Sequence, residues 1–148
     1  TSSEKVEKTK KPAKRKSLKG IKVLLAEDND LNAELAAILL EDSEMIVTRA
    51  ADGQEVVDLF ANHPAGTYDI ILMDIMMPKM DGLQAAKAIR AMQAERPDAE
   101  EIPIIALSAN AFAEDVQTSL DAGMNGHVSK PLNVAEVAKV IARNLNKS

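Results

Sequence analysis

The sequence contains no cysteine and no tryptophan, and aromatic residues make up only 2% of its 148 residues. Without cysteine, the chain can form neither structural disulfides nor thiolate metal sites. Its core must therefore be built from Ala, Val, Ile, Leu and Met. Its apolar runs are also short, and none approaches the roughly 18 apolar residues of a membrane-spanning helix. What remains is a chain long enough for one globular domain with a real core.

Charge is distributed unevenly along this chain. Residues 1–19 hold eight Lys or Arg and two Glu, a net charge of about +6, whereas residues 20–148 carry about −11. The basic segment has almost no apolar residues, so burial cannot offset the entropy lost on ordering it. We therefore predict a disordered basic linker over residues 1–19 and one domain over residues 20–148. Contact of the linker with nucleic acid or an anionic membrane is the alternative.

After Gly20, short apolar runs alternate with longer segments in which apolar residues recur at helical spacing. The runs predict strands at residues 21–26, 45–50, 68–73, 102–108 and 126–130. The longer segments predict helices at residues 31–42, 51–63, 81–93, 111–123 and 133–145. Strands this apolar need cover on both faces, which predicts an α/β fold with a five-stranded parallel sheet and five helices on both its faces.

The pattern also predicts the start of the first helix, its apolar positions and one loop. Asp30 precedes the first helix and is the expected N-cap, and Leu31, Leu35, Ile38 and Leu39 supply that helix's apolar spacing. Residues 94–101, with the sequence AERPDAEE, are expected to form a polar loop.

Polar residues stand where the predicted strands end. Glu27 and Asp28 follow the first strand, Asp74 the third, Ser108 ends the fourth and Lys130 the fifth. Because the carboxyl ends of parallel strands meet at one edge of a sheet, we expect these side chains to converge in a crevice there.

Closely packed carboxylates repel one another, and burial disfavours their charged form. Lys130 can offset one negative charge, and a hard divalent cation such as Mg²⁺, which prefers oxygen ligands, can offset more. A carboxylate beside such a cation can act as a nucleophile, so the cluster indicates phosphoryl chemistry.

The sequence of residues 20–146 resembles the receiver domain of two-component response regulators. The matching segments are LLAEDND (24–30), DIILMDIMMPKMDG (69–82), LSANAFAED (107–115) and DAGMNGHVSKP (121–131). The forms AEDN, SANAF and AGMNGHVSKP further resemble receivers fused to hybrid sensor histidine kinases. The resemblance implies a flavodoxin-like receiver fold with strand order 2-1-3-4-5.

The resemblance also implies a role for each matching residue at the acidic edge. Asp74 matches the aspartate that accepts a phosphoryl group. Glu27, Asp28, Asp74 and the backbone carbonyl of Met76 match the groups that hold Mg²⁺, for which Mn²⁺ can substitute.

Three further positions match residues that contact the phosphoryl group or respond to it. Lys130 matches the lysine that pairs with a phosphoryl oxygen, and Ser108 the hydroxyl that turns toward it. His127 stands where many receivers carry Tyr or Phe, so with Ser108 it is the expected switch that alters the surface of the last helices and strand.

The implied partners are a histidine kinase, a histidine phosphotransfer domain or both, with no nucleic acid. The resemblance further implies a cytoplasmic domain of a parent histidine kinase, with or without a membrane anchor. The receiver itself would at most phosphorylate and dephosphorylate itself. The chain begins with Thr, which fits either removal of an initiator Met or a segment of a longer protein. The alternatives are a stand-alone response regulator and a pseudo-receiver that acts without phosphate. An aspartate-nucleophile phosphatase or dehalogenase would carry a second acid at position 76, where this chain has Met.

Overall fold

A computed structural model describes the chain over residues 19–64, 67–75, 77, 80–108, 117–118, 120–129 and 133–145, with the backbone alone at residues 108, 129, 134, 144 and 145. Five strands form one sheet: β1 (Lys22–Ala26), β2 (Ile46–Ala50), β3 (Ile70–Asp74), β4 (Ile104–Ser108) and β5 (Gly126–Ser129). Every neighbouring pair is parallel, and the order is β2-β1-β3-β4-β5. The predicted α/β fold and strand order are confirmed.

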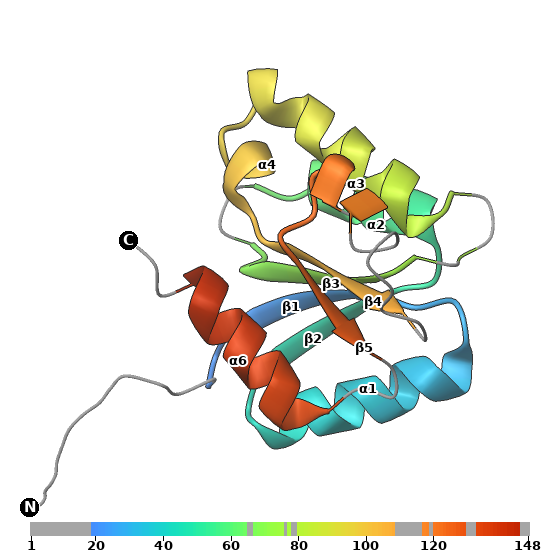
Figure 1. Cartoon of the computed structure of the whole chain (residues 1–148), viewed down its shortest axis with the longest axis vertical. Coiled ribbons are helices and arrows are strands. Elements are labelled where there is room, and N and C mark those ends of the chain that lie inside the picture. The colour runs from blue at the N-terminus through green and yellow to red at the C-terminus, as the bar shows by residue number, and fades with distance from the viewer. Residues whose placement is uncertain are drawn as a thin grey trace, which may run out of the picture.

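Helices cover both faces of this sheet (Figure 1). One face packs against α1 (Asp30–Asp42) and α6 (Val134–Leu145). The other packs against α2 (Gly53–Ala61), α3 (Gly82–Arg90) and the short α4 (Asp98–Glu101). Of the helix predicted at 111–123, the structure describes residues 117, 118 and 120–123; residues 117, 118, 120 and 121 are helical, and residues 122 and 123 form a turn. None of the helices in the described ranges is long and apolar enough to span a membrane.

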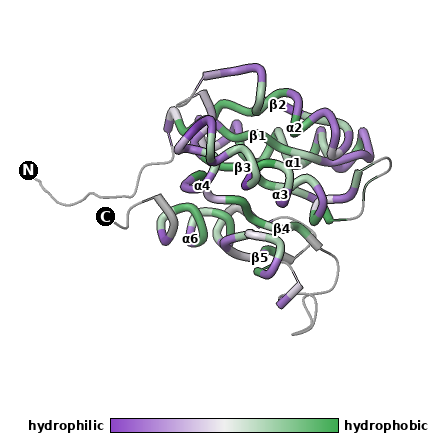
Figure 2. The backbone as a smooth tube through the Cα atoms, turned by 90° about the horizontal axis from the view of Figure 1, so that it is seen from above, coloured by the Kyte–Doolittle hydropathy of each residue, from purple (hydrophilic) through white to green (hydrophobic). Residues whose placement is uncertain are grey.

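The core lies between the sheet and each helical layer, as the aliphatic composition predicts. The central strands are hydrophobic along their length (Figure 2) because both of their faces are covered. All five residues of β3 are buried. The predicted linker and its boundary at residue 19 stay predictions, since residues 1–18 lie outside the described ranges.

The first helix begins one residue earlier than predicted. Asn29, in an extended conformation, is the N-cap, and its side-chain oxygen accepts a hydrogen bond of 2.9 Å from the amide of Asn32. Asp30 is the first helical residue, where its negative charge favours the helix N-terminus. The expectation that Asp30 caps this helix is therefore wrong, because Asn fills the same role one position earlier.

The apolar residues that predicted α1 do not face the sheet. Helix α1 buries Ala33, Ala36 and Leu40, whereas four larger side chains are 36–63% exposed; these four, which we call the α1 apolar face, are Leu31, Leu35, Ile38 and Leu39. The small alanines let α1 lie close to the sheet, and the larger residues are left on its outer side.

Residues 94–101 form helical turns rather than a loop, which corrects the prediction. A 3₁₀ helix, η2 (Ala91–Ala94), extends α3, and α4 follows. Arg96 joins this segment to α2: its guanidinium lies 4.2 Å from the Phe60 ring centre, donates to the Phe60 carbonyl and pairs with the Asp98 carboxylate. The Asp98 carboxylate raises the pKa of Arg96.

Arg90 ties the same segment to the turn before β5. Its guanidinium donates to the backbone carbonyls of Ala99, Ile102 and Gly123 and to the side chain of Asn125. Burial lowers the pKa of Arg90, because charge is disfavoured away from water. The connection from α3 to β4 is thus held by two arginines, Arg90 at the end of α3 and Arg96 between η2 and α4.

Candidate functional site

Two neighbouring strands reach acidic residues at one edge of the sheet. Glu27 and Asp28 directly follow β1, and β3 ends on Asp74. Ala26 pairs with Met73 in the parallel register of these strands, so Glu27 and Asp74 each lie one residue beyond a paired position. The chain leaves β1 for α1 on one face and β3 for α3 on the other, and such a point in an α/β sheet is where a crevice opens.

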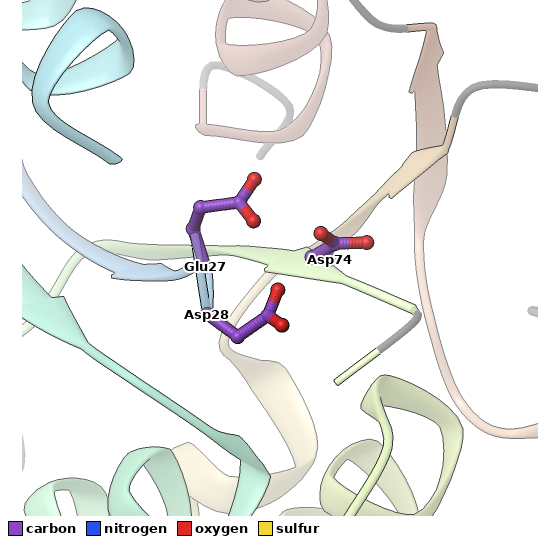
Figure 3. Close-up of side chains that lie close together, drawn as sticks. All are labelled: Glu27, Asp28 and Asp74. Atoms are coloured by element: carbon purple, nitrogen blue, oxygen red, sulfur yellow. The ribbon is translucent and has the colours of Figure 1, made fainter. Parts of the chain in front are cut away.

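The side chains of these acids converge, as Figure 3 shows. One carboxylate oxygen from each of Glu27, Asp28 and Asp74 lies within 4.8 Å of the other two. Glu27 and Asp74 are 3% and 5% exposed, whereas Asp28 is exposed. The predicted convergence of these three acids is therefore present in the structure.

Three carboxylates at this separation repel one another, and burial weakens the screening of that repulsion. Carboxylate oxygens are the ligands that hard cations such as Mg²⁺ and Mn²⁺ prefer. The oxygen-only donor set, the short separations and the partial burial fit a divalent cation at this edge.

Close backbone packing fixes the position of Asp74. The amide of Gly82 donates a hydrogen bond of 2.9 Å to the carbonyl of Ile75. A Cβ at Gly82 would collide with the carbonyl oxygen of Asp74, so only glycine lets the start of α3 approach the end of β3 this closely. Asp81 and Gln84 close a capping box at the same helix end.

A basic residue, Arg49 near the end of β2, holds the loop that carries the other two acids. We call residues 27–29 the acid loop. The guanidinium of Arg49 donates to the carbonyls of Glu27 and Asp28 and pairs with the Asp30 carboxylate at 2.8 Å. Sequence reasoning missed Arg49; the available signal was a lone charge in the apolar run IVTRA.

The other predicted site residues are placed only in part. Ser108 ends β4 and pairs with Ser129 in the backbone register, but its side chain lies outside the described residues. Met76 and Lys130 also lie outside them. His127 is on β5, and within the described part of the chain its buried Nε2 has no hydrogen-bond partner.

Comparison with protein-family models identifies the family to which a chain with this sheet and this acidic edge belongs. The model described as response regulator receiver domain matches residues 23–142, which include β1 from its second residue and the other four strands in full. The chain belongs to this family. The receiver domain is 39% identical to hybrid signal transduction histidine kinase B of Dictyostelium discoideum over 97% of the chain. It is 37% identical to sensor protein GacS of Pseudomonas syringae pv. syringae over 82% of the chain.

This receiver domain spans 8% and 13% of the lengths of those two relatives. Among solved structures it resembles the receiver domain of sensor histidine kinase PA1611 of Pseudomonas aeruginosa PAO1, which holds a magnesium ion in its active-site cleft. The TM-score is 0.75 and the identity 36%, over 86% of this chain and 99% of that one.

A second solved relative is the receiver domain of the Saccharomyces cerevisiae response regulator Ssk1, crystallised with the histidine phosphotransfer protein Ypd1. The TM-score is 0.77 and the identity 28%, over 88% of this chain and 92% of that one. Both likenesses extend the family assignment to the three-dimensional fold.

Proposed function

We propose that this receiver domain accepts a phosphoryl group on the carboxylate of Asp74, from a phosphohistidine and with Mg²⁺ bound. The observation that carries the proposal is the cluster of Glu27, Asp28 and Asp74 at the carboxyl edge of the sheet, with oxygens within 4.8 Å of one another. Asp74 ends a fully buried strand, and the close approach of Gly82 fixes the backbone that carries its carboxylate. A fixed nucleophile favours in-line attack.

The transfer exchanges one bond to phosphorus for another. A carboxylate oxygen of Asp74 attacks the phosphorus while the P–N bond to the donor histidine breaks. The histidine ring, protonated on its other nitrogen, keeps the electron pair and leaves as neutral imidazole. The product is an aspartyl phosphate on this chain.

Glu27, Asp28 and Asp74 would hold the cation, and the relative with magnesium in its cleft supports that assignment. When bound, Mg²⁺ supplies positive charge that offsets the carboxylates and the phosphoryl oxygens. We further assign the fourth protein ligand to the carbonyl of Met76, the phosphoryl contacts to Lys130 and Ser108, and the switch to Ser108 and His127. The roles of these four residues rest on the sequence resemblance.

The proposed partner is a domain that carries the phosphohistidine: a histidine kinase, a histidine phosphotransfer domain or both. Such a partner must reach Asp74 across the carboxyl edge of the sheet, where α1 begins directly after the acid loop. The α1 apolar face, with Leu31 63% and Ile38 55% exposed, continues from that edge and offers the apolar centre that protein interfaces use. The solved complex of Ypd1 with a related receiver supports this class of partner.

The parent protein is proposed to be a hybrid histidine kinase, with residues 1–19 as the linker to the preceding part. The similarity to hybrid kinases of Dictyostelium and to GacS supports this origin. The −11 charge of residues 20–148 would raise the local concentration of the cation at the acidic edge.

Incubation with acetyl phosphate and Mg²⁺, followed by intact mass spectrometry, tests the proposal. The wild-type chain should gain one phosphoryl group, and neither Asp74→Asn nor the wild type with a chelator should. Phosphorylated histidine phosphotransfer domains should serve as donors in a parallel reaction. A wild-type chain that stays unmodified with both donors would identify a pseudo-receiver instead.

A further inference from the structure

We propose that Arg49 is a positioning residue that presets the acid loop for the cation. Its guanidinium fixes the backbone of residues 27–29, and this holds the carboxylates of Glu27 and Asp28 beside Asp74 before any cation binds. The inference rests on the proposed function, because it concerns the same metal site.

The contacts of Arg49 reach two successive peptide groups. Nε and Nη2 donate to the carbonyl of Glu27 at 3.1 and 2.9 Å, and Nη2 also reaches the carbonyl of Asp28 at 3.3 Å. Nη1 donates to the Asp30 carboxylate at 2.8 Å. One planar group therefore spans the loop and the first residue of α1. An ammonium could not reproduce this fork, since its donors radiate from a single nitrogen.

The carbonyl contacts matter more than the ion pair. The side chain of Asp30 is 93% exposed, and water screens an ion pair of that kind strongly. The side chain of Arg49 is only 32% exposed, and its donors to Glu27 and Asp28 meet backbone oxygens that set the direction of both side chains. Loss of Arg49 would remove the contacts that hold the two carbonyls, and the repulsion among the three carboxylates would then favour their separation.

Charge and position make opposite predictions for the removal of Arg49. A guanidinium beside the acid loop repels a second cation, so electrostatics alone predicts that Arg49→Gln binds Mg²⁺ more tightly. Positioning predicts weaker binding, because the free loop must be ordered when the cation arrives. The sign of the change in affinity decides between these two accounts.

The experiment is a calorimetric titration of Mg²⁺ into the full chain and three variants. Arg49→Gln should weaken binding about tenfold, the usual cost of removing a group that orients metal ligands. Arg49→Lys keeps the charge but loses the fork, so it should also weaken binding. Asp30→Asn breaks the ion pair and leaves the carbonyl contacts, and it should stay close to wild type.

Two further readouts separate positioning from general loss of structure. The rate of acetyl phosphate uptake by Arg49→Gln should recover nearly to the wild-type value at saturating Mg²⁺, while the half-saturating Mg²⁺ concentration rises. Without Mg²⁺, the amides of Asp28 and Asn29 should exchange hydrogen faster in Arg49→Gln than in wild type. A purely structural role would instead lower the unfolding temperature and leave the Mg²⁺ dependence as it was.

The outcomes distinguish this inference from the proposed function. If the wild type binds no Mg²⁺, the metal part of the proposed function fails and the inference fails with it. If the wild type binds Mg²⁺ and Arg49→Gln binds it equally or more tightly, the inference alone is overturned. If Arg49→Gln binds Mg²⁺ more weakly but Arg49→Lys matches wild type, the planar fork of donors is not needed, which also overturns the inference.

Discussion

Helices α1 and α6 pack against the same face of the sheet and use their apolar residues in different ways. Helix α6 buries Val137, Val140 and Ile141, and its outward positions include Glu136 and Lys139. Helix α1 buries two alanines and Leu40, and its larger apolar side chains face outward. Packing against the sheet therefore explains the positions of the described apolar residues of α6, whereas it does not explain the large apolar residues of α1.

The surplus of apolar residues on α1 points to a partner. Single exposed apolar residues are ordinary on protein surfaces, but several neighbouring ones on one helix form a patch of the kind that marks an interaction site. The α1 apolar face starts beside the acid loop, where the proposed phosphoryl donor would approach. Helix α6 shows that this fold does not require such a face for its stability.

A matched pair of truncations should show the largest effect. Ile141 in α6 is 1% exposed, so Ile141→Ala leaves a cavity and should cost about 2–5 kcal/mol of stability. Ile38 in α1 is 55% exposed, so Ile38→Ala should cost about 0.5 kcal/mol or less. Urea unfolding of the two variants and the wild type measures both values. Equal losses would show that α1 is packed like α6 and would remove the basis for docking.

A double substitution on α1 should impair transfer from a partner and spare the chemistry. Leu35→Ser with Ile38→Ser should slow transfer from a phosphorylated histidine domain at limiting concentration about thirtyfold, since two buried anchors that contribute about 1 kcal/mol each sum to about 2 kcal/mol. Uptake from acetyl phosphate, which needs no docking surface, should be unchanged. Rapid-quench assays with both donors give the two rates.

The control for that experiment lies on the other helix. Glu136→Ser with Lys139→Ser changes the outward face of α6 and should leave both rates as in wild type. If the α1 and α6 variants slow transfer from the phosphorylated donor equally, the α1 apolar face is not a specific docking surface.

The helix caps offer the smallest test. Asn29 caps α1 and Asn133 caps α6, each through its side-chain oxygen. Replacement of either by Ala should cost about 1 kcal/mol of stability. Only Asn29 belongs to the acid loop, so only Asn29→Ala should also weaken Mg²⁺ binding. Unfolding and calorimetric titration of the two variants check this, and equal effects on Mg²⁺ would argue against a role for the start of α1.

The fold was predictable because its signals are local. Short apolar runs and helical spacing mark the strands and helices, and the parallel topology then forces Glu27, Asp28 and Asp74 to one edge. The exact cap of α1 was missed by one residue, since Asn and Asp cap helices equally well. Helical spacing also cannot tell which side of α1 meets the sheet, because small alanines pack well but weigh little in an apolar pattern.

The roles of Arg49 and Arg96 could not be predicted from the sequence, because they depend on contacts between residues far apart in the chain. Arg49 acts on backbone carbonyls, and a carbonyl has no signature in the sequence because every residue carries one. Arg96 orders the segment at 94–101 through the ring and carbonyl of Phe60. In both cases an arginine bridges two elements, and only the folded chain reveals its partners.

Reductive trapping of the phosphorylated chain tests the central claim most directly. Borohydride reduces an aspartyl phosphate to homoserine, and peptide sequencing by mass spectrometry then locates the altered residue. The account predicts homoserine at position 74 after treatment with a phosphohistidine donor and Mg²⁺, and none in the absence of the donor. Homoserine at Asp28 or at another carboxylate, with residue 74 unchanged, would contradict it.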